Sequence, residues 1–227
     1  MPTAREVLLD AALSALATLP WTSVRMVDVA SAAGVSRQTL HNEFGGKDGL
    51  ASALVRDAAD GYLAGVERAL GTAGGTADRL AATAAWTVRA VRTNVLVKAL
   101  LTGCWNERLP RPDPLVAGCP DPLPGPRSAG PGLPTPAELL RRAGERAVAA
   151  LDAERPPRDP EALAVTCEIA LRLALSYALV PAPSGTGGEP APLVRHVVAR
   201  VPDAVSGTSP TAGARSPRRS PGRSTPA

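Results

Sequence analysis

The residues between Ser36 and Asn42 carry side chains suited to reading the edges of nucleic-acid bases. Arg37 can donate two parallel hydrogen bonds to O6 and N7 of guanine, and Gln38 can bind N6 and N7 of adenine. Asn42 lies four residues after Gln38, so a helix places both amide side chains on the same face. Arg37 and Gln38 are therefore the candidates for base recognition, with Asn42 beside them.

Four further residues around this segment are candidates for contacts with backbone phosphates, namely Ser36, Thr39, His41 and Lys47. Lys47 stands at the start of a predicted helix, where the helix N-terminus adds partial positive charge. Contacts of this kind fix the register of a protein on a duplex and carry no sequence information.

A helix that presents polar side chains outward needs an apolar face that holds it in place. Leu40 and Phe44 are four residues apart and supply that face. Ala30 and Ala33 are small enough to let the preceding helix cross closely, and Gly34 can adopt the positive φ of a tight turn. An Ala-rich pair of helices with a glycine turn is also a common αα-hairpin, so this pattern alone leaves a purely structural interpretation open.

The segment Val27–Leu50 reads VDVASAAGVSRQTLHNEFGGKDGL and resembles the helix-turn-helix of TetR-type transcriptional regulators. The matching residues are Asp28-Val29-Ala30, Ala33-Gly34-Val35-Ser36, Thr39-Leu40, Phe44, Lys47 and Leu50. A first helix of suitable length and Trp21 in the connector precede them. The resemblance implies a DNA-binding domain at residues 1–50 and a helical ligand-binding and dimerisation domain at residues 51–201.

The resemblance also implies a homodimer that binds a palindromic double-stranded DNA operator and, as a repressor, releases it when a small-molecule effector binds. Trp86, Leu101, Trp105 and Tyr177 are then candidates for lining the effector pocket. Large aromatic side chains are also ordinary core residues, which is the alternative for these positions. The expected dimer face combines the helices predicted at residues 161–180 and 193–201.

Three residues depart from the family pattern. His41 stands where tyrosine is usual, Arg25 stands where a hydroxyl would cap the second helix, and Glu43 adds negative charge near the proposed phosphate contacts. Because imidazole loses its proton near neutral pH, His41 predicts that DNA binding weakens as the pH rises. The alternative function is a helical ligand-binding or protein-interaction module that has lost specific DNA binding.

Apolar periodicity and capping residues predict an all-α protein. The predicted helices cover residues 5–19, 26–33, 36–44, 47–70, 76–92, 93–101, 136–154, 160–180 and 193–201. Thr135 and Asp159 are expected to cap two of them, since each precedes proline at the first helical position. Ten prolines at residues 110–136 predict a long irregular loop, and residues 202–227 predict a disordered tail.

Composition restricts the function further. The net charge of +4 does not indicate DNA binding, because residues 1–60 carry five basic and seven acidic side chains. Cys104, Cys119 and Cys167 have no ligand spacing, so we expect no disulfide framework and no metal site, with Cys104 and Cys167 as buried structural thiols. Motifs of catalysis and cofactor binding are not visible, and no long uncharged apolar stretch occurs. We expect a cytoplasmic protein that is not an enzyme, needs no cofactor and does not contact a membrane.

Overall fold

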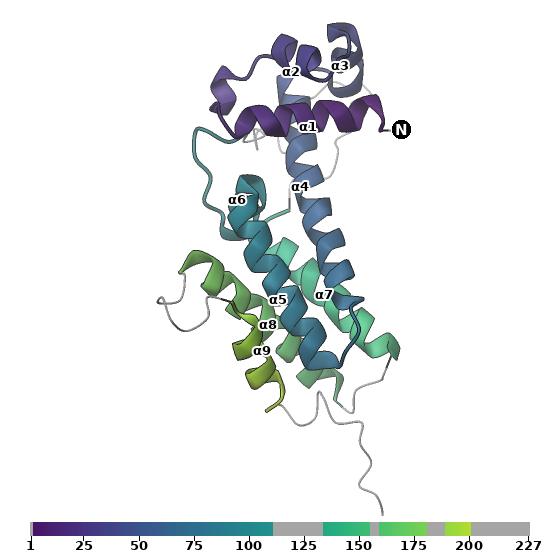
Figure 1. Cartoon of the computed structure of the whole chain (residues 1–227), viewed down its shortest axis with the longest axis vertical. Coiled ribbons are helices and arrows are strands. Elements are labelled where there is room, and N and C mark those ends of the chain that lie inside the picture. The colour runs from purple at the N-terminus through teal and green to yellow at the C-terminus, as the bar shows by residue number, and fades with distance from the viewer. Residues whose placement is uncertain (1, 111–133, 155–158, 181–188, 201–227) are drawn as a thin grey trace, which may run out of the picture.

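A computed structural model describes residues 2–110, 134–154, 159–180 and 189–200, and the regular structure within them is entirely helical (Figure 1). The elements are α1 (Ala4–Leu16), the 3-10 turn η1 (Trp21–Ser23), α2 (Met26–Ala32), α3 (Arg37–Phe44), α4 (Lys47–Leu70), α5 (Thr76–Thr93), α6 (Val95–Thr102), α7 (Pro136–Glu154), α8 (Pro160–Leu179) and α9 (Ala191–Val198). The prediction of an all-α fold is confirmed.

The helices form two groups joined by α4 (Figure 1). Helices α1 to α3 lie across one end of α4, α5 to α7 pack against the rest of it, and α8 and α9 pack against α5. The 24 residues of α4 span roughly 36 Å at 1.5 Å per residue. Its buried residues run from Leu50 to Leu70, so one continuous helix contributes to both cores.

Side-chain caps fix several helix starts as the sequence predicts. Ser36 Oγ accepts a hydrogen bond from the Thr39 amide at 3.0 Å, and Thr135 Oγ1 accepts one from the Glu138 amide at 3.2 Å. Asp159 caps α8 in the same way. Arg25 makes no side-chain cap bond at α2, as its residue type predicts. These polar contacts satisfy amide groups that have no partner within their helix.

The boundaries differ most from the prediction at three places, and by about one residue at several others. Helix α1 ends at Leu16 instead of Leu19, because residues 17 and 18 form a turn before Pro20. Asn94 separates α5 from α6, and its side chain accepts hydrogen bonds from the first amides of α6. Helix α9 covers residues 191–198, two residues earlier than predicted at its start. The predicted proline-rich loop lies largely, and the tail wholly, outside the described residues.

Helix α5 lies at the centre of the bundle and packs against α4, α6, α8 and α9. Trp86 on α5 fits against Gly65 on α4, where a β-carbon would come within 2.1 Å of the indole ring. The Trp86 indole N–H donates to the Tyr62 carbonyl at 3.1 Å. A glycine therefore lets a large aromatic residue join two helices at close range.

The two cysteines within the described residues have different surroundings. Cys167 is buried in α8, and burial raises the pKa of its thiol to about 12, as the prediction of an inert structural thiol requires. Cys104 is exposed after α6, so the prediction that it is buried is wrong. Gly103 ends α6 with φ of 71°, and the chain then leaves the bundle surface. Cys119 lies outside the described residues.

Candidate nucleic-acid interface

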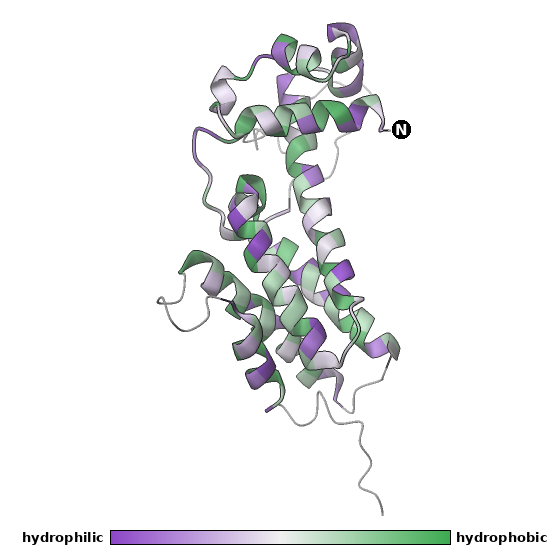
Figure 2. Cartoon of the chain, in the orientation of Figure 1, coloured by the Kyte–Doolittle hydropathy of each residue, from purple (hydrophilic) through white to green (hydrophobic). Residues whose placement is uncertain are grey.

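Helix α3 has one apolar face in the core and one polar face in solvent. Leu40 and Phe44 are 1% and 8% exposed. Arg37, Gln38, His41 and Asn42 are all exposed, and Figure 2 shows α3 as one of the most hydrophilic parts of the N-terminal group. The structure therefore presents the predicted base-reading side chains to solvent on one short, anchored helix.

The turn before α3 sets the angle at which the helix leaves the core. Gly34 has φ of +67°, a region that residues with a β-carbon rarely adopt. The Val35 amide donates to the Ala30 carbonyl at 3.0 Å and closes the turn. Ala30 itself is 2% exposed between α2 and its neighbours. The prediction that Gly34 makes a left-handed turn is confirmed.

Hydrogen bonds preorganise the exposed face of α3. Gln38 Nε2 donates to Asn42 Oδ1 at 2.8 Å, which joins two of the predicted contact residues along the helix. The hydroxyls of Ser36 and Thr39 lie 2.8 Å apart at the helix start. Each amide has further donor and acceptor capacity beyond the bond it makes here. The pair can thus contact a ligand while its rotamers stay restricted.

Lys47 lies differently from the other predicted contact residues. Its ammonium donates to the Thr22 carbonyl at 3.2 Å and lies 5.2 Å from the centre of the Trp21 ring. Both partners belong to the connector between α1 and α2. In this structure Lys47 links the start of α4 to that connector, so a contact with phosphate requires it to leave these partners.

Arg5 supports α3 and was not among the residues predicted from the sequence. Its guanidinium donates to the Glu43 carbonyl at 3.4 Å, lies 3.9 Å from the Glu43 carboxylate, and stacks 4.7 Å from the centre of the Phe44 ring. It therefore holds the last turn of α3 against α1 and opposes the negative charge of Glu43. These residues are 38 and 39 positions apart, so no local pattern could reveal the contact.

Residues 8–54 match the family described as bacterial regulatory proteins, tetR family. The match covers α1, α2, α3 and the start of α4, the elements that hold and present the polar face. The chain carries a TetR-family helix-turn-helix domain. The resemblance seen in the sequence is thereby confirmed for this part of the molecule.

A curated relative supports the assignment of the TetR-type domain. The chain is 42% identical over 66 residues to the HTH-type transcriptional regulator AlkX of Mycobacterium tuberculosis. That stretch is 29% of this chain and 31% of the relative, so the chain matches about a third of the relative's length.

Solved structures extend the likeness to the fold outside the TetR-type domain. The TetR family repressor AlkX of Dietzia sp. has a TM-score of 0.52 and 20% identity, over 88% of this chain and 97% of that one. A TetR/AcrR family regulator of Thermobifida fusca has a TM-score of 0.50 and 16% identity, over 87% and 95% of the two chains. At these identities the comparisons establish a shared all-helical fold.

The four residues predicted for an effector pocket lie on different segments. Trp86 packs between α4 and α5 with Arg68 and Arg89 beside its ring, and Leu101 is 3% exposed in α6. Trp105 follows α6, and Tyr177 lies on α8, both partly buried against the core. None of the four lines the groove between α7 and α8 that is described below. Their role in binding an effector stays a prediction.

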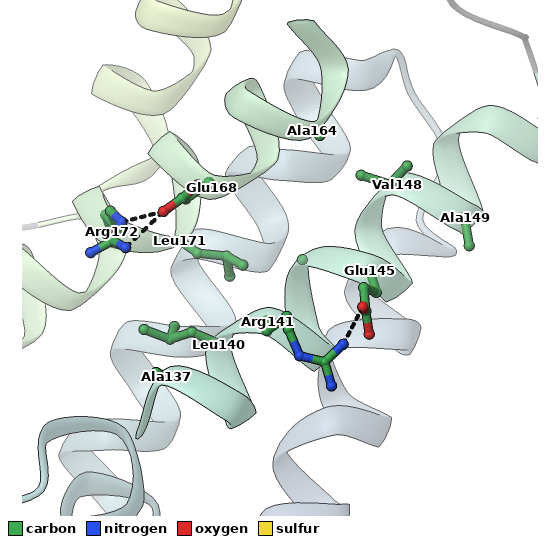
Figure 3. Close-up of a pocket in the computed structure, with 11 residues that line it drawn as sticks. Ala137, Leu140, Arg141, Glu145, Val148, Ala149, Ala164, Glu168, Leu171 and Arg172 are labelled. Carbon is green, nitrogen blue, oxygen red and sulfur yellow. Dashed lines mark hydrogen bonds and ion pairs between the residues drawn. The ribbon is translucent and has the colours of Figure 1, made fainter. Parts of the chain in front are cut away.

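A groove of about 560 Å³ lies between α7 and α8 on the outside of the bundle (Figure 3). Leu140 and Val148 line it from α7, and Ala164 and Leu171 line it from α8. Ion pairs stand at its rim, with Arg141 joined to Glu145 and Arg172 joined to Glu168 at 2.7 Å. The sequence analysis did not single out this groove, because its two walls come from separate helices.

Proposed function

We propose that the protein is a sequence-specific transcriptional regulator that binds a palindromic operator as a homodimer. The observation that carries the proposal is the polar, solvent-facing side of α3 in a domain of the TetR family. Arg37 and Gln38 lie in its first turn, the end of a recognition helix that enters the major groove in helix-turn-helix proteins. The proposed readout is Arg37 to guanine and Gln38 to adenine.

Phosphate contacts would come from the residues around this turn. Ser36, Thr39 and His41 are positioned on or beside the exposed side of α3. Lys47 joins them if it exchanges the Thr22 carbonyl for a phosphate oxygen. The Arg5 ion pair counters the charge of Glu43, which removes one reason to favour a domain that has lost DNA binding.

The dimer interface that we propose is the α7–α8 surface. An 18-residue stretch of α8 has a mean hydropathy of 1.6, so the helix is long and apolar enough to span a membrane by length and composition alone, yet only 33% of that stretch is buried. Val165 on α8 is 50% exposed, and the apolar groove runs beside it. Both acidic and basic side chains stand on the rim, which is compatible with a two-fold, self-complementary interface.

This face differs in part from the one expected from the sequence. Helix α8 remains in the proposed interface, but α9 packs against α5 and buries Val194 and Val198 in the bundle. Helix α7 replaces it as the second element, because α7 forms the other wall of the groove. A two-fold axis running along the length of the molecule would bring the two α3 helices to the same end of the dimer, as binding to two half-sites needs.

Repression relieved by a small molecule is the proposed regulatory mode. The structural relative from Dietzia is described as a repressor, implicated in n-alkane biodegradation. In one conformation of the dimer the spacing of the two α3 helices would match the half-sites, and in another it would not. A ligand that binds the mismatched conformation more tightly would lower operator affinity, and the loss would equal the difference in its binding free energy between the two conformations.

Selection of DNA from a random duplex pool at physiological salt tests the proposal. The wild type should enrich a palindrome, and Arg37→Ala should weaken binding to it by roughly 10- to 100-fold, the equivalent of about 1–3 kcal/mol for a bidentate base contact. Lys98→Ala removes an exposed cation from α6 and should leave affinity unchanged. A folded wild type that enriches no sequence would contradict the proposal and favour the helical module without specific DNA binding.

A further inference from the structure

A segment of eight residues, Gly103–Pro110, leaves the end of α6 and reaches the TetR-type domain (Figure 1). We call this segment the strap. It meets the connector between α1 and α2, where the Trp21 amide donates to the Arg108 carbonyl at 2.9 Å. The bundle therefore contacts the helix-turn-helix domain through the connector, in addition to the continuous helix α4.

The strap has a defined conformation where it approaches the connector. Asn106 Oδ1 accepts a hydrogen bond from the Arg108 amide at 3.0 Å, and the Leu109 amide donates to the Asn106 carbonyl at 3.1 Å. Leu109 packs partly buried against the core, and Pro110 is buried. These contacts form a turn that aims the Arg108 carbonyl at Trp21.

The other side of the contact is equally well held. The Trp21 side chain is 9% exposed, and its ring carries the Lys47 ammonium at 5.2 Å. The Lys47 ammonium also donates to the Thr22 carbonyl at 3.2 Å. Trp21 thus joins three parts of the molecule, namely the connector, the start of α4 and the strap.

A second attachment changes what the TetR-type domain can do mechanically. A domain joined to a bundle by one helix can swing as that helix bends or twists. Fixing a second point away from the helix axis removes most of these movements. The distance between the two recognition helices of a dimer must match the half-site spacing. If the orientation of each helix-turn-helix domain is already fixed in the free protein, DNA binding does not have to restrict it, and less conformational entropy is lost.

We propose that the strap, through the Arg108–Trp21 hydrogen bond, fixes the orientation of the helix-turn-helix domain on the bundle and so positions α3 for its operator. The inference about DNA rests on the proposed function. The inference about orientation does not, and it can be tested without DNA. Trp21 acts here as a positioning residue, and Asn106 shapes the turn that reaches it.

The first experiment lengthens the strap by inserting Gly-Gly between Gly103 and Cys104. The insertion leaves the turn at Asn106 intact but lengthens the strap, so that the strap restricts the position of the connector less. A matched insertion between Gly74 and Gly75 lengthens the loop at the far end of α4 instead. Circular dichroism and sedimentation should show the same helicity and oligomeric state for both variants and the wild type.

Orientation is measured by electron–electron double resonance between spin labels at Ser31→Cys on α2 and Asp152→Cys on α7. Cys104 and Cys119 are replaced by serine, and labelled protein is diluted with unlabelled protein so that distances within one chain dominate. The strap insertion should broaden the distance distribution, and the control insertion should not. An unchanged distribution in the strap variant overturns the proposal, whatever the protein does with DNA.

Operator affinity is measured on the same two variants. The strap insertion should weaken operator binding about tenfold or more and lower the ratio of specific to non-specific affinity, while the control stays within twofold of the wild type. A broadened distance distribution with unchanged operator affinity overturns the role in recognition. A wild type that binds no operator contradicts the proposed function, and the spin-label distances still decide the role of the strap.

Asn106→Ala provides a second variant if the insertion prevents folding. It removes the side-chain acceptor of the Arg108 amide and should speed hydrogen exchange at the Trp21 amide, with a smaller loss of operator affinity in the same direction. Arg108→Lys keeps both the charge and the backbone carbonyl and should leave exchange and affinity unchanged. Equal exchange at Trp21 in Asn106→Ala and wild type contradicts the proposed anchor.

Discussion

The outer face of α3 and the groove between α7 and α8 are both helix surfaces without a covering element, but their chemistry is opposite. On α3 the exposed side chains are polar, and the apolar Leu40 and Phe44 point into the core. On α8 the exposed side chains include Val165 at 50% and Ala164 in the groove wall. The two surfaces therefore suit different partners.

The difference lies in what each surface gains by being covered. Polar side chains on α3 keep their hydrogen bonds to water in the free protein, so their exposure costs little and their value lies in specificity. The groove exposes apolar area, and its removal from water contributes roughly 25 cal/mol per Å². Stable association is therefore expected at the groove, and sequence recognition at α3.

The largest expected effect comes from placing a charge in the groove. Ala164→Glu puts a carboxylate on an exposed position of the free subunit, which the monomer tolerates, but buries it in the proposed dimer. An unpaired buried charge costs several kcal/mol, so dimerisation should weaken by about 100-fold or more. Analytical ultracentrifugation over a concentration series measures the change.

Ala64→Glu is the matched control, because Ala64 is also an exposed alanine within a helix and does not line the groove. It should dimerise like the wild type. If both variants dimerise normally, the α7–α8 surface is not the dimer interface, and the proposed difference in partner between this groove and α3 is contradicted.

An intermediate effect is expected from the residue that supports α3. Arg5→Met removes the hydrogen bond to the Glu43 carbonyl and the guanidinium over Phe44, so operator affinity should fall about tenfold while dimerisation is unchanged. Fluorescence anisotropy with a labelled operator measures the loss. Glu43→Gln keeps the carbonyl contact and should cost less; a larger loss in Glu43→Gln than in Arg5→Met would contradict this order.

The smallest effect concerns acidic residues on α1 and α4, between the two surfaces. Partial burial, together with Asp10 and Asp60, raises the pKa of Asp57 above its ordinary value. The folded state therefore favours the neutral carboxyl, and this contribution is complete below the unfolded pKa and lost as pH rises through the folded pKa. Asp57→Asn should raise the melting temperature slightly at pH 7 and leave it unchanged below about pH 4.

Thermal denaturation followed by circular dichroism at both pH values checks this sign. In an Asp10→Asn background the stabilisation by Asp57→Asn should be smaller, because one of the neighbouring negative charges is already gone. An equal rise in melting temperature at both pH values would contradict the electrostatic origin.

Most helices could be predicted from the sequence, because their signals are local. Ser36 predicts the start of α3 through its hydroxyl, and Asp159 predicts that of α8 through its carboxylate. Gly34 predicts the turn between α2 and α3. The exposed side of α3 follows as well, since Leu40 and Phe44 fix the buried face and helical geometry places Gln38 and Asn42 elsewhere.

Contacts between distant segments could not be predicted in the same way. Arg5 meets Glu43 only because α1 crosses the end of α3, and Trp21 meets Arg108 only because the strap returns from the bundle. Lys47 has the residue type of a phosphate ligand, yet in the folded chain its ammonium lies over Trp21.

The sequence by itself determined the helices, most of their caps and the residues on the outward face of α3, because each depends on neighbours within about four positions. Only the tertiary structure decided which helices leave an apolar groove, which side chains brace α3 and where the bundle attaches to the helix-turn-helix domain. These features depend on how helices pack at long range, where side-chain volume and shape, rather than periodicity, select the partners.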